Sequence, residues 1–138
     1  MYRAYTVLGG GVFLSCFPPF FLYTQLSGRY GNHLQERLGY VPRKVIRKLE
    51  GAPRIWLHAV SLGEVRVAVS IVKALYELMP ECSILVSTTT EHGRELAGEV
   101  FSGSKTPVIY GPVDFVGSVR MAMARVRPDV VAFLETEI

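Results

Sequence analysis

The sequence predicts an α/β fold, a Rossmann-like sheet of parallel strands preceded by an apolar amino-terminal helix. From Arg54 onward, short runs rich in valine and isoleucine alternate with longer runs of helical periodicity, a texture typical of β-α-β units. The chain has 138 residues, of which 49% are hydrophobic and 20% charged. This length and composition suit one domain with a buried core, not a disordered chain.

The amino-terminal segment is apolar, with no charged residue among the 24 residues Ala4–Ser27. A straight helix of that length would measure about 36 Å, against roughly 30 Å for a hydrocarbon core. Gly9–Gly11 and Pro18–Pro19 interrupt the run, so a bent span and a shallow insertion both fit. A secretory signal peptide is the alternative, but only Arg3 precedes the run and no Ala-x-Ala site follows. We predict a membrane anchor over residues 1–28.

A basic segment follows the anchor. Between Arg29 and Arg54 there are seven basic and two acidic residues, a net charge of +5, whereas the whole chain carries +3. A basic segment beside an apolar run favours anionic lipid, and the positive-inside rule places the rest of the chain in the cytoplasm. No nucleic-acid-binding motif is present, so no nucleic-acid partner is expected. We predict that residues 29–53 form a basic juxtamembrane connector with one or two amphipathic pieces.

The residues from 54 to 138 carry the repeating strand and helix pattern. The predicted strands, which are short apolar runs rich in valine and isoleucine as in buried parallel sheets, are Ile55–Val60, Ile84–Ser87, Val108–Tyr110 and Val130–Leu134. The predicted helices between them are Gly63–Met79, Glu91–Phe101 and Phe115–Val126. Pro80 and Pro128 end the first and the last of these helices. Right-handed crossovers then give a doubly wound sheet.

The loops that follow the strands are the predicted site. Carboxyl ends of parallel strands open on one edge of a sheet, where ligands bind. We therefore expect a single crevice lined by Ser61–Glu64, Thr88–Thr90, Gly111–Asp114 and Glu135–Glu137.

Glu64 has two interpretations. Ser61-Leu62-Gly63-Glu64 fits the S-x-x-E capping box, in which the serine and the glutamate satisfy each other's backbone N–H groups. Alternatively, Glu64 is a general base that takes a proton from an acceptor hydroxyl, although a helix N-terminus lowers the basicity of a carboxylate. Glu135 and Glu137 follow an apolar strand, where carboxylates are costly unless they are exposed, paired or functional.

The remaining motifs favour structural roles. Thr90 suits an ordinary helix N-cap, although a strand-to-helix turn of this kind also binds phosphate. His58 and His92 lack the spacing of a zinc site, so we expect a hydrogen-bonded structural role for each and no metal. Cys16 and Cys82 form neither a ligand spacing nor a disulfide framework. Neither a glycine-rich dinucleotide fingerprint nor a Walker sequence is present, so no cofactor is expected.

Several motifs together resemble the amino-terminal half of the Kdo (3-deoxy-D-manno-octulosonic acid) transferases of lipopolysaccharide synthesis. The resemblance spans nearly the whole chain and includes the apolar amino terminus. Its motifs are Gln35-Glu36-Arg37-Leu38-Gly39, Ile55-Trp56-Leu57-His58-Ala59-Val60-Ser61-Leu62-Gly63-Glu64, Ser87-Thr88-Thr89-Thr90, Pro112-Val113-Asp114 and Glu135-Thr136-Glu137-Ile138.

The resemblance implies a GT-B glycosyltransferase at the cytoplasmic face of the bacterial inner membrane. Such an enzyme moves Kdo from CMP-Kdo to the lipid A precursor, lipid IVA, with inversion. It further implies that Glu64 is the general base, that Glu135 supports the transition state, and that Ser61 and Gly63 contact substrate. Residues 54–138 would be the acceptor-binding domain.

The family pattern continues past Ile138 into a second domain that binds the CMP-sugar. We therefore expect this chain to be the acceptor half, inactive alone. Two alternatives stay open. One is a GT-B transferase that uses another nucleotide sugar, and the other is a non-catalytic, membrane-bound lipid-binding module.

Overall fold

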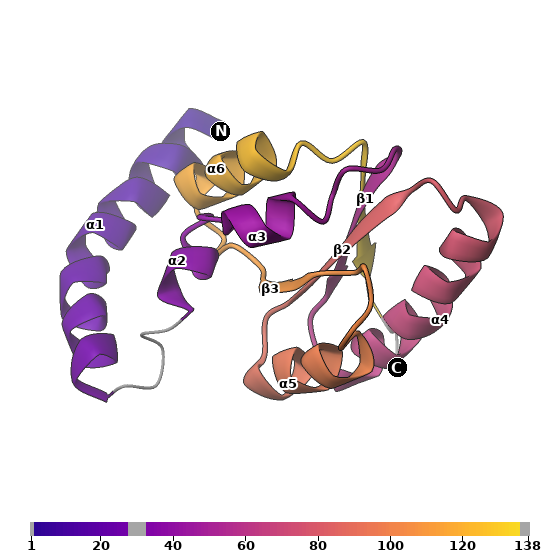
Figure 1. Cartoon of the computed structure of the whole chain (residues 1–138). Coiled ribbons are helices and arrows are strands. Elements are labelled where there is room, and N and C mark those ends of the chain that lie inside the picture. The colour runs from indigo at the N-terminus through magenta and orange to yellow at the C-terminus, as the bar shows by residue number, and fades with distance from the viewer. Residues whose placement is uncertain (1, 28–32, 136–138) are drawn as a thin grey trace.

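The computed structural model describes residues 2–27 and 33–135. Its centre is a sheet of four parallel strands (Figure 1), namely β1 (Arg54–Ala59), β2 (Ser83–Thr88), β3 (Val108–Tyr110) and β4 (Val130–Leu134). The predicted α/β class and parallel sheet are confirmed, and each predicted strand agrees with the observed one to within one residue at either end.

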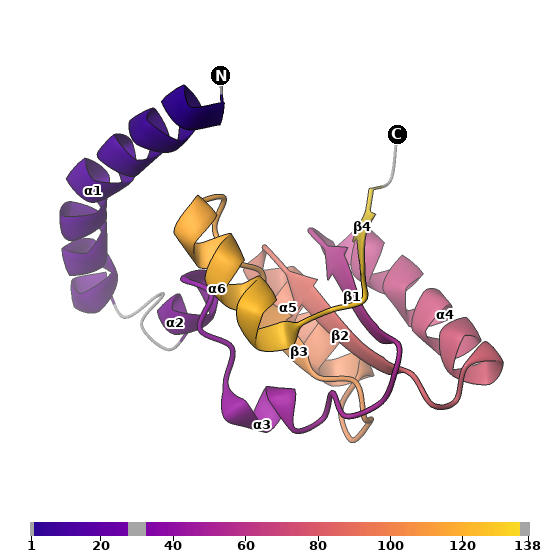
Figure 2. The same cartoon turned by 90° about the horizontal axis from the view of Figure 1, so that it is seen from above.

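Helices cover both faces of the sheet (Figure 2). α4 (Leu62–Leu78) and α5 (Glu91–Val100) bury one face, together with strand residues such as Ile55 and Leu57. α6 (Val116–Val126) covers the other face, where Trp56 and Leu85 are buried. Because successive side chains of a strand point to opposite faces, β1 supplies both cores.

The strand order places a topological switch point beside β1. The sheet runs β3-β2-β1-β4, so the chain moves from β1 outward to β3, and α6 then returns it to the other side of β1. Ala59 and Leu134 are register partners at the carboxyl ends of β1 and β4. Ligands of doubly wound sheets bind where the strand order reverses. Ser61–Glu64 and Glu135 follow the two strands that flank this point.

The basic segment before β1 is packed into the second core. Where one or two amphipathic pieces were expected, the structure contains two short helices, α2 (Leu34–Arg37) and α3 (Arg43–Ile46), and residues 28–32 lie outside the described residues. Val41, Val45 and Leu49 are buried against α6 and the sheet. Their four-residue spacing was a signal that this segment has an apolar side.

Gly39 sets the approach of this segment to α6. Its φ is +91°, a region that L side chains rarely adopt, and a Cβ there would lie 2.1 Å from the carbonyl oxygen of Ser118. Only glycine allows the two backbones to come this close. Two residues before Gly39, the Arg37 carbonyl accepts the Val113 N–H at 2.7 Å, which joins the end of α2 to the loop after β3.

The amino-terminal segment is helical, as predicted, but it corrects the anchor expectation. α1 (Tyr2–Ser27) is bowed (Figure 2) and contains Pro18 and Pro19, which remove backbone donors from its ladder. Among the described residues, none of the helices is both long and apolar enough to cross a bilayer. The apolar membrane-anchor helix expected over residues 1–28 is thus not found in the part of the chain that the structure describes. α1 contacts the domain through Phe13, whose ring stacks on Phe115 at 4.2 Å.

Candidate active site

A crevice of about 650 Å³ opens at the carboxyl edge of the sheet. His58 of β1 and Phe133 of β4 line it from the sheet, and Met123 lines it from α6. Two of the loops predicted to line a crevice do so, through Thr89 after β2 and Gly111–Asp114 after β3. The prediction is therefore confirmed for half of the expected loops.

Ser61, Gly63 and Glu64 lie outside the lining of this crevice, as does Glu135. The reason lies in the helices that follow the strands. α4 starts directly after β1 and carries Ser61–Glu64 toward the face that α4 covers, whereas the crevice opens on the face that α6 covers. Glu135 is exposed beyond β4, and Thr136–Ile138 of its motif lie outside the described residues. Both carboxylates thus follow the strands that flank the switch point, outside the lining of the crevice.

The local geometry of Glu64 is that of a helix cap. Ser61 is the N-cap of α4, and the two side chains form the reciprocal capping box. The Ser61 N–H donates to Oε2 of the half-buried Glu64 at 2.9 Å. The capping interpretation is confirmed, and the role of Glu64 as a base stays a prediction. Thr90 likewise caps α5, because its Oγ1 accepts from the Gly93 N–H at 3.1 Å.

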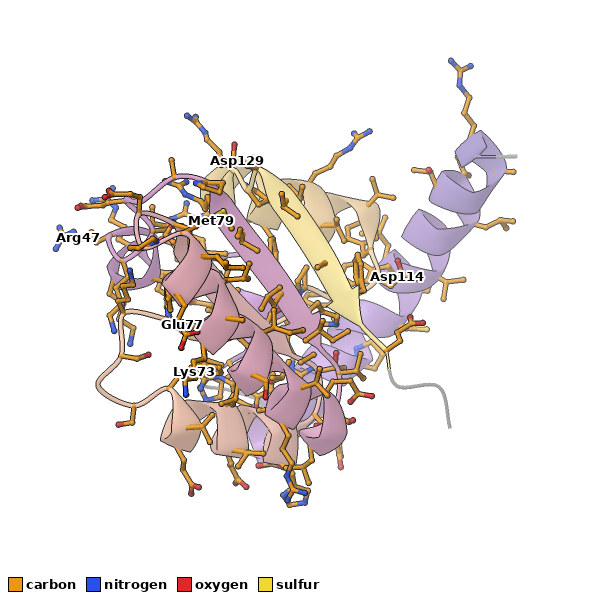
Figure 3. The ribbon with its side chains drawn as sticks, turned by 90° about the vertical axis from the view of Figure 1, so that its right-hand side faces the viewer. Arg47, Lys73, Glu77, Met79, Asp114 and Asp129 are labelled. Atoms are coloured by element: carbon orange, nitrogen blue, oxygen red, sulfur yellow. The ribbon has the colours of Figure 1, made fainter. Side chains whose placement is uncertain are left out.

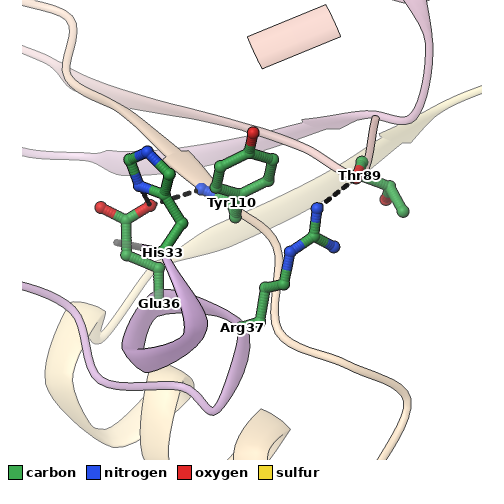
Figure 4. Close-up of polar contacts among 5 residues, drawn as sticks. All are labelled: His33, Glu36, Arg37, Thr89 and Tyr110. Carbon is green, nitrogen blue, oxygen red and sulfur yellow. Dashed lines mark hydrogen bonds and ion pairs between the residues drawn. The ribbon is translucent and has the colours of Figure 1, made fainter. Parts of the chain in front are cut away.

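Arg37 joins α2 to the ends of β2 and β3 (Figure 4). Its Nη2 donates to the Thr89 carbonyl at 2.9 Å, and its guanidinium lies 4.2 Å from the centre of the Tyr110 ring. Glu36, the preceding residue, accepts the Tyr110 N–H on Oε2 at 2.9 Å. Burial raises the pKa of the Tyr110 hydroxyl above its ordinary value of 10.0, and the Arg37 charge works against that rise. These contacts hold the Arg37 guanidinium, a cation, in the lining of the crevice.

A second cavity, of about 620 Å³, lies between α1 and the domain. Its walls are mostly apolar and include Phe13, Phe17, Leu34 and Phe115. It shares three lining residues with the crevice, namely Arg37, Val113 and Asp114. Figure 3 shows Asp114 toward the carboxyl end of the sheet, away from Asp129 at the start of β4. The two cavities therefore meet at the Arg37 side chain, a residue that sequence reasoning did not single out although it lies in the Gln35–Gly39 motif.

His58 takes part in a buried hydrogen-bond chain. Trp56 Nε1 donates to Ser87 Oγ at 2.8 Å, and Ser87 Oγ lies 2.7 Å from His58 Nδ1. The expected hydrogen-bonded role of His58 is confirmed, and burial lowers its pKa below the ordinary 6.5. The exposed His92 has its Nδ1 3.4 Å from Oε2 of Glu95, three residues further along α5. Within residues 2–27 and 33–135, no three His, Cys, Asp or Glu side chains gather as a metal site would require.

The fold and the crevice define a Rossmann-like α/β domain that presents two cavities and a cation at its strand ends. The family model described as 3-Deoxy-D-manno-octulosonic-acid transferase (kdotransferase) matches residues 32–138. The chain therefore belongs to the Kdo transferase family.

Curated relatives agree with this assignment. A 3-deoxy-D-manno-octulosonic acid transferase of Chlamydia pneumoniae is 34% identical over 118 residues, which cover 85% of this chain and 26% of the relative. That of Haemophilus influenzae is 32% identical over 112 residues, 81% of this chain and 25% of the relative. A bifunctional glycosyltransferase/methyltransferase of Fusobacterium nucleatum is 33% identical over 85 residues, 61% of this chain and 13% of the relative.

The chain thus spans about a quarter of the length of the Kdo transferases it matches. No solved structure matches the chain.

Proposed function

We propose that this chain is the acceptor-binding part of a glycosyltransferase that moves Kdo from CMP-Kdo to lipid IVA in lipopolysaccharide synthesis. The observation that carries the proposal is the meeting of two mostly apolar cavities at Arg37. One lies against α1, and the other lies at the ligand-binding edge of the sheet, where His58 and Thr89 add polar groups to its lining. An amphipathic acceptor needs apolar walls for its acyl chains and a few polar groups for its sugar and phosphates.

The charge of Arg37 suits the phosphate of that acceptor. A guanidinium binds phosphate oxygens through paired N–H donors, and Arg37 is already oriented by Thr89 and Tyr110. An acyl chain in the apolar cavity and a sugar in the crevice would place a connecting phosphate beside it. The proposed lipid acceptor would thus contact both cavities and Arg37 at the same time.

In the proposed reaction, the acceptor hydroxyl attacks the anomeric carbon of Kdo, and CMP leaves from the opposite face. Glu64 takes the hydroxyl proton as general base, and Ser61 and Gly63 contact substrate beside it. Transition states of glycosyl transfer carry positive charge on the sugar, which a carboxylate such as Glu135 would stabilise. Both carboxylates follow the strands that flank the switch point. The CMP-Kdo donor is bound by residues outside this chain, and the reaction uses no cofactor.

We further propose that the protein works at the cytoplasmic face of the inner membrane, where lipid IVA would be presented. α1 supports this because several of its apolar side chains are more than half exposed, among them Val7, Leu8, Leu14 and Leu22. Exposed apolar side chains gathered on one helix are typical of a surface that contacts lipid or another apolar partner. Flotation with vesicles of inner-membrane lipid tests this, and a protein that stays at the bottom of the gradient contradicts it.

The transfer assay tests the proposed reaction. A polypeptide in which residues 1–138 are continuous with a donor-binding domain should transfer labelled Kdo from CMP-Kdo to lipid IVA. The 138-residue chain alone should bind lipid IVA without turnover. Failure of the continuous polypeptide to use CMP-Kdo would overturn the reaction.

The similarity to the Fusobacterium nucleatum glycosyltransferase/methyltransferase favours one second candidate, transfer of a sugar from another nucleotide. Competition among nucleotide sugars in the same assay separates the two reactions. Lipid IVA binding with no transfer from any donor would instead leave the third reading, a non-catalytic lipid-binding module.

A further inference from the structure

The His58 ring is fixed from three sides. Its Nδ1 meets the fully buried Ser87 hydroxyl at 2.7 Å. Gly111 packs against its Cε1, so closely that a Cβ at position 111 would lie 2.6 Å from that atom. Phe133 approaches edge-on, with ring centres 5.7 Å apart and planes inclined by 72°. The imidazole therefore has one orientation, and its Nε2 is on the side of Thr89.

The buried chain also determines which ring nitrogen carries the hydrogen. Trp56 Nε1 can only donate, so Ser87 Oγ accepts from it. The Ser87 hydroxyl hydrogen then needs an acceptor, and His58 Nδ1 is the partner that the structure gives it. If Nδ1 were protonated, Ser87 would face two donors and its own hydrogen would be buried without a partner, which is costly. The chain thus selects a neutral imidazole with hydrogen on Nε2.

The Nε2–H group has a weak partner within the protein. Thr89 Oγ1 lies 3.3 Å from Nε2, at the long end of hydrogen-bond distances, and this residue is exposed. His58 and Thr89 both line the crevice. A ligand oxygen in the crevice can therefore replace Thr89 as the acceptor of this hydrogen.

We infer that His58 is an acceptor-binding residue whose Nε2–H donates to an oxygen of the lipid-linked sugar in the crevice, with Ser87 and Trp56 as the positioning residues that hold this tautomer. The identity of the ligand rests on the proposed function. The tautomer does not, because it follows from the buried chain alone. A neutral donor at this position recognises a hydroxyl, ether or phosphate oxygen without adding a charge to the crevice beside Arg37.

Nitrogen-15 NMR of the 138-residue chain tests the tautomer directly. Protonated and unprotonated ring nitrogens resonate far apart, and the chain has three histidines, which variants at His33, His58 and His92 assign. We expect hydrogen on Nε2 of His58 at neutral pH, and a mixture of tautomers in Ser87→Ala or, should that variant not fold, in Trp56→Phe. Hydrogen on Nδ1 in the unaltered chain would overturn the inference.

Titration of the same sample with lipid IVA in detergent micelles tests the contact. We expect the His58 Nε2 resonance to move, and His58→Phe to weaken binding about tenfold, as loss of one hydrogen bond to a ligand does. His58→Gln, which keeps a donor, should recover most of the affinity, and His92→Gln should match the unaltered chain. Binding with His58 unmoved overturns this inference alone. Absence of any binding overturns the proposed acceptor, and with it the assigned ligand of His58.

Discussion

The backbone N–H of Ser61 donates to Glu64 Oε2 at 2.9 Å, so the Glu64 carboxylate is part of the N-terminal cap of α4. A capping contact and a catalytic role make different demands on the side chain. The cap needs an oxygen that accepts a hydrogen bond, whereas a base needs a group that gains a proton. Glutamine meets the first demand and not the second, so one substitution separates the two roles.

Glu64→Gln should leave the fold intact and reduce transfer. Glutamine also serves at this position of a capping box, so the free energy of unfolding should change by less than about 0.5 kcal/mol. Loss of a positioned general base should lower kcat about 10²- to 10⁴-fold. Urea unfolding of the 138-residue chain measures the first quantity, and the Kdo transfer assay with a donor domain measures the second.

Two variants serve as controls for Glu64. Ser61→Ala removes the serine side of the cap and should cost about 1 kcal/mol of stability. Glu91→Gln changes the acidic residue in the first turn of α5 and should leave transfer unchanged. Full transfer activity in Glu64→Gln would restrict Glu64 to the capping role.

Arg37→Lys should weaken lipid IVA binding about tenfold. Lysine keeps the charge but lacks the planar fork that reaches the Thr89 carbonyl while it covers the Tyr110 ring. Isothermal titration with lipid IVA in micelles measures the effect. Arg94→Lys is the matched control, since its guanidinium lies 5.8 Å from the centre of the same ring and lines neither of the two cavities. Equal losses in both variants would argue against a specific contact of Arg37 with the acceptor.

The strands and helices could be predicted from sequence because each has a local signal. β1 is mostly apolar, and Pro80 and Pro128 follow the ends of α4 and α6. The common edge of the loops that follow the strands was predicted from this pattern, since parallel strands share their carboxyl edge. The capping box was equally local, as its two residues are three positions apart.

The lining of the cavities could be predicted only in part, because it depends on contacts between distant segments. Arg37 meets Thr89 across 52 positions, and the His58 chain joins neighbouring strands through Ser87, 29 positions away. The face on which the crevice opens is decided by α6, whose position no local pattern reveals. The anchor expectation rested on the absence of charge from Ala4 to Ser27, and among the described residues no helix able to cross a bilayer is found.

Gly111→Ala should destabilise the domain by about 1 to 3 kcal/mol, because the new Cβ would lie 2.6 Å from His58 Cε1 and the ring cannot move without breaking its bond to Ser87. A smaller side chain at position 58 should relieve the clash. In a double-mutant cycle with His58→Ala, the two changes should therefore cost less together than their sum. Urea unfolding provides all four free energies, and additivity would show that the ring is free to move.

A second glycine gives the control for that cycle. Gly98 lies inside α5, where an added Cβ would meet only the end of the Arg94 side chain, at 3.4 Å. Gly98→Ala should stabilise the protein by about 0.5 to 1 kcal/mol, because alanine has less backbone freedom to lose in a helix.

Acidification should destabilise the protein through His58. Burial lowers the pKa of His58 in the folded state below 6.5, its ordinary value. Between the lowered pKa and 6.5, the unfolded chain binds a proton at this residue that the folded chain does not, so the free energy of unfolding decreases as pH falls. His58→Gln removes this proton, and the variant should lose less stability than the unaltered chain between about pH 7.5 and about pH 5. Arg37 and Asp114 line the same crevice in both proteins, so the difference isolates His58. His92→Gln is the control, since the His92 side chain is 80% exposed, and its stability should change with pH as that of the unaltered chain does. Equal pH dependence of stability in the unaltered chain, His58→Gln and His92→Gln would contradict the prediction.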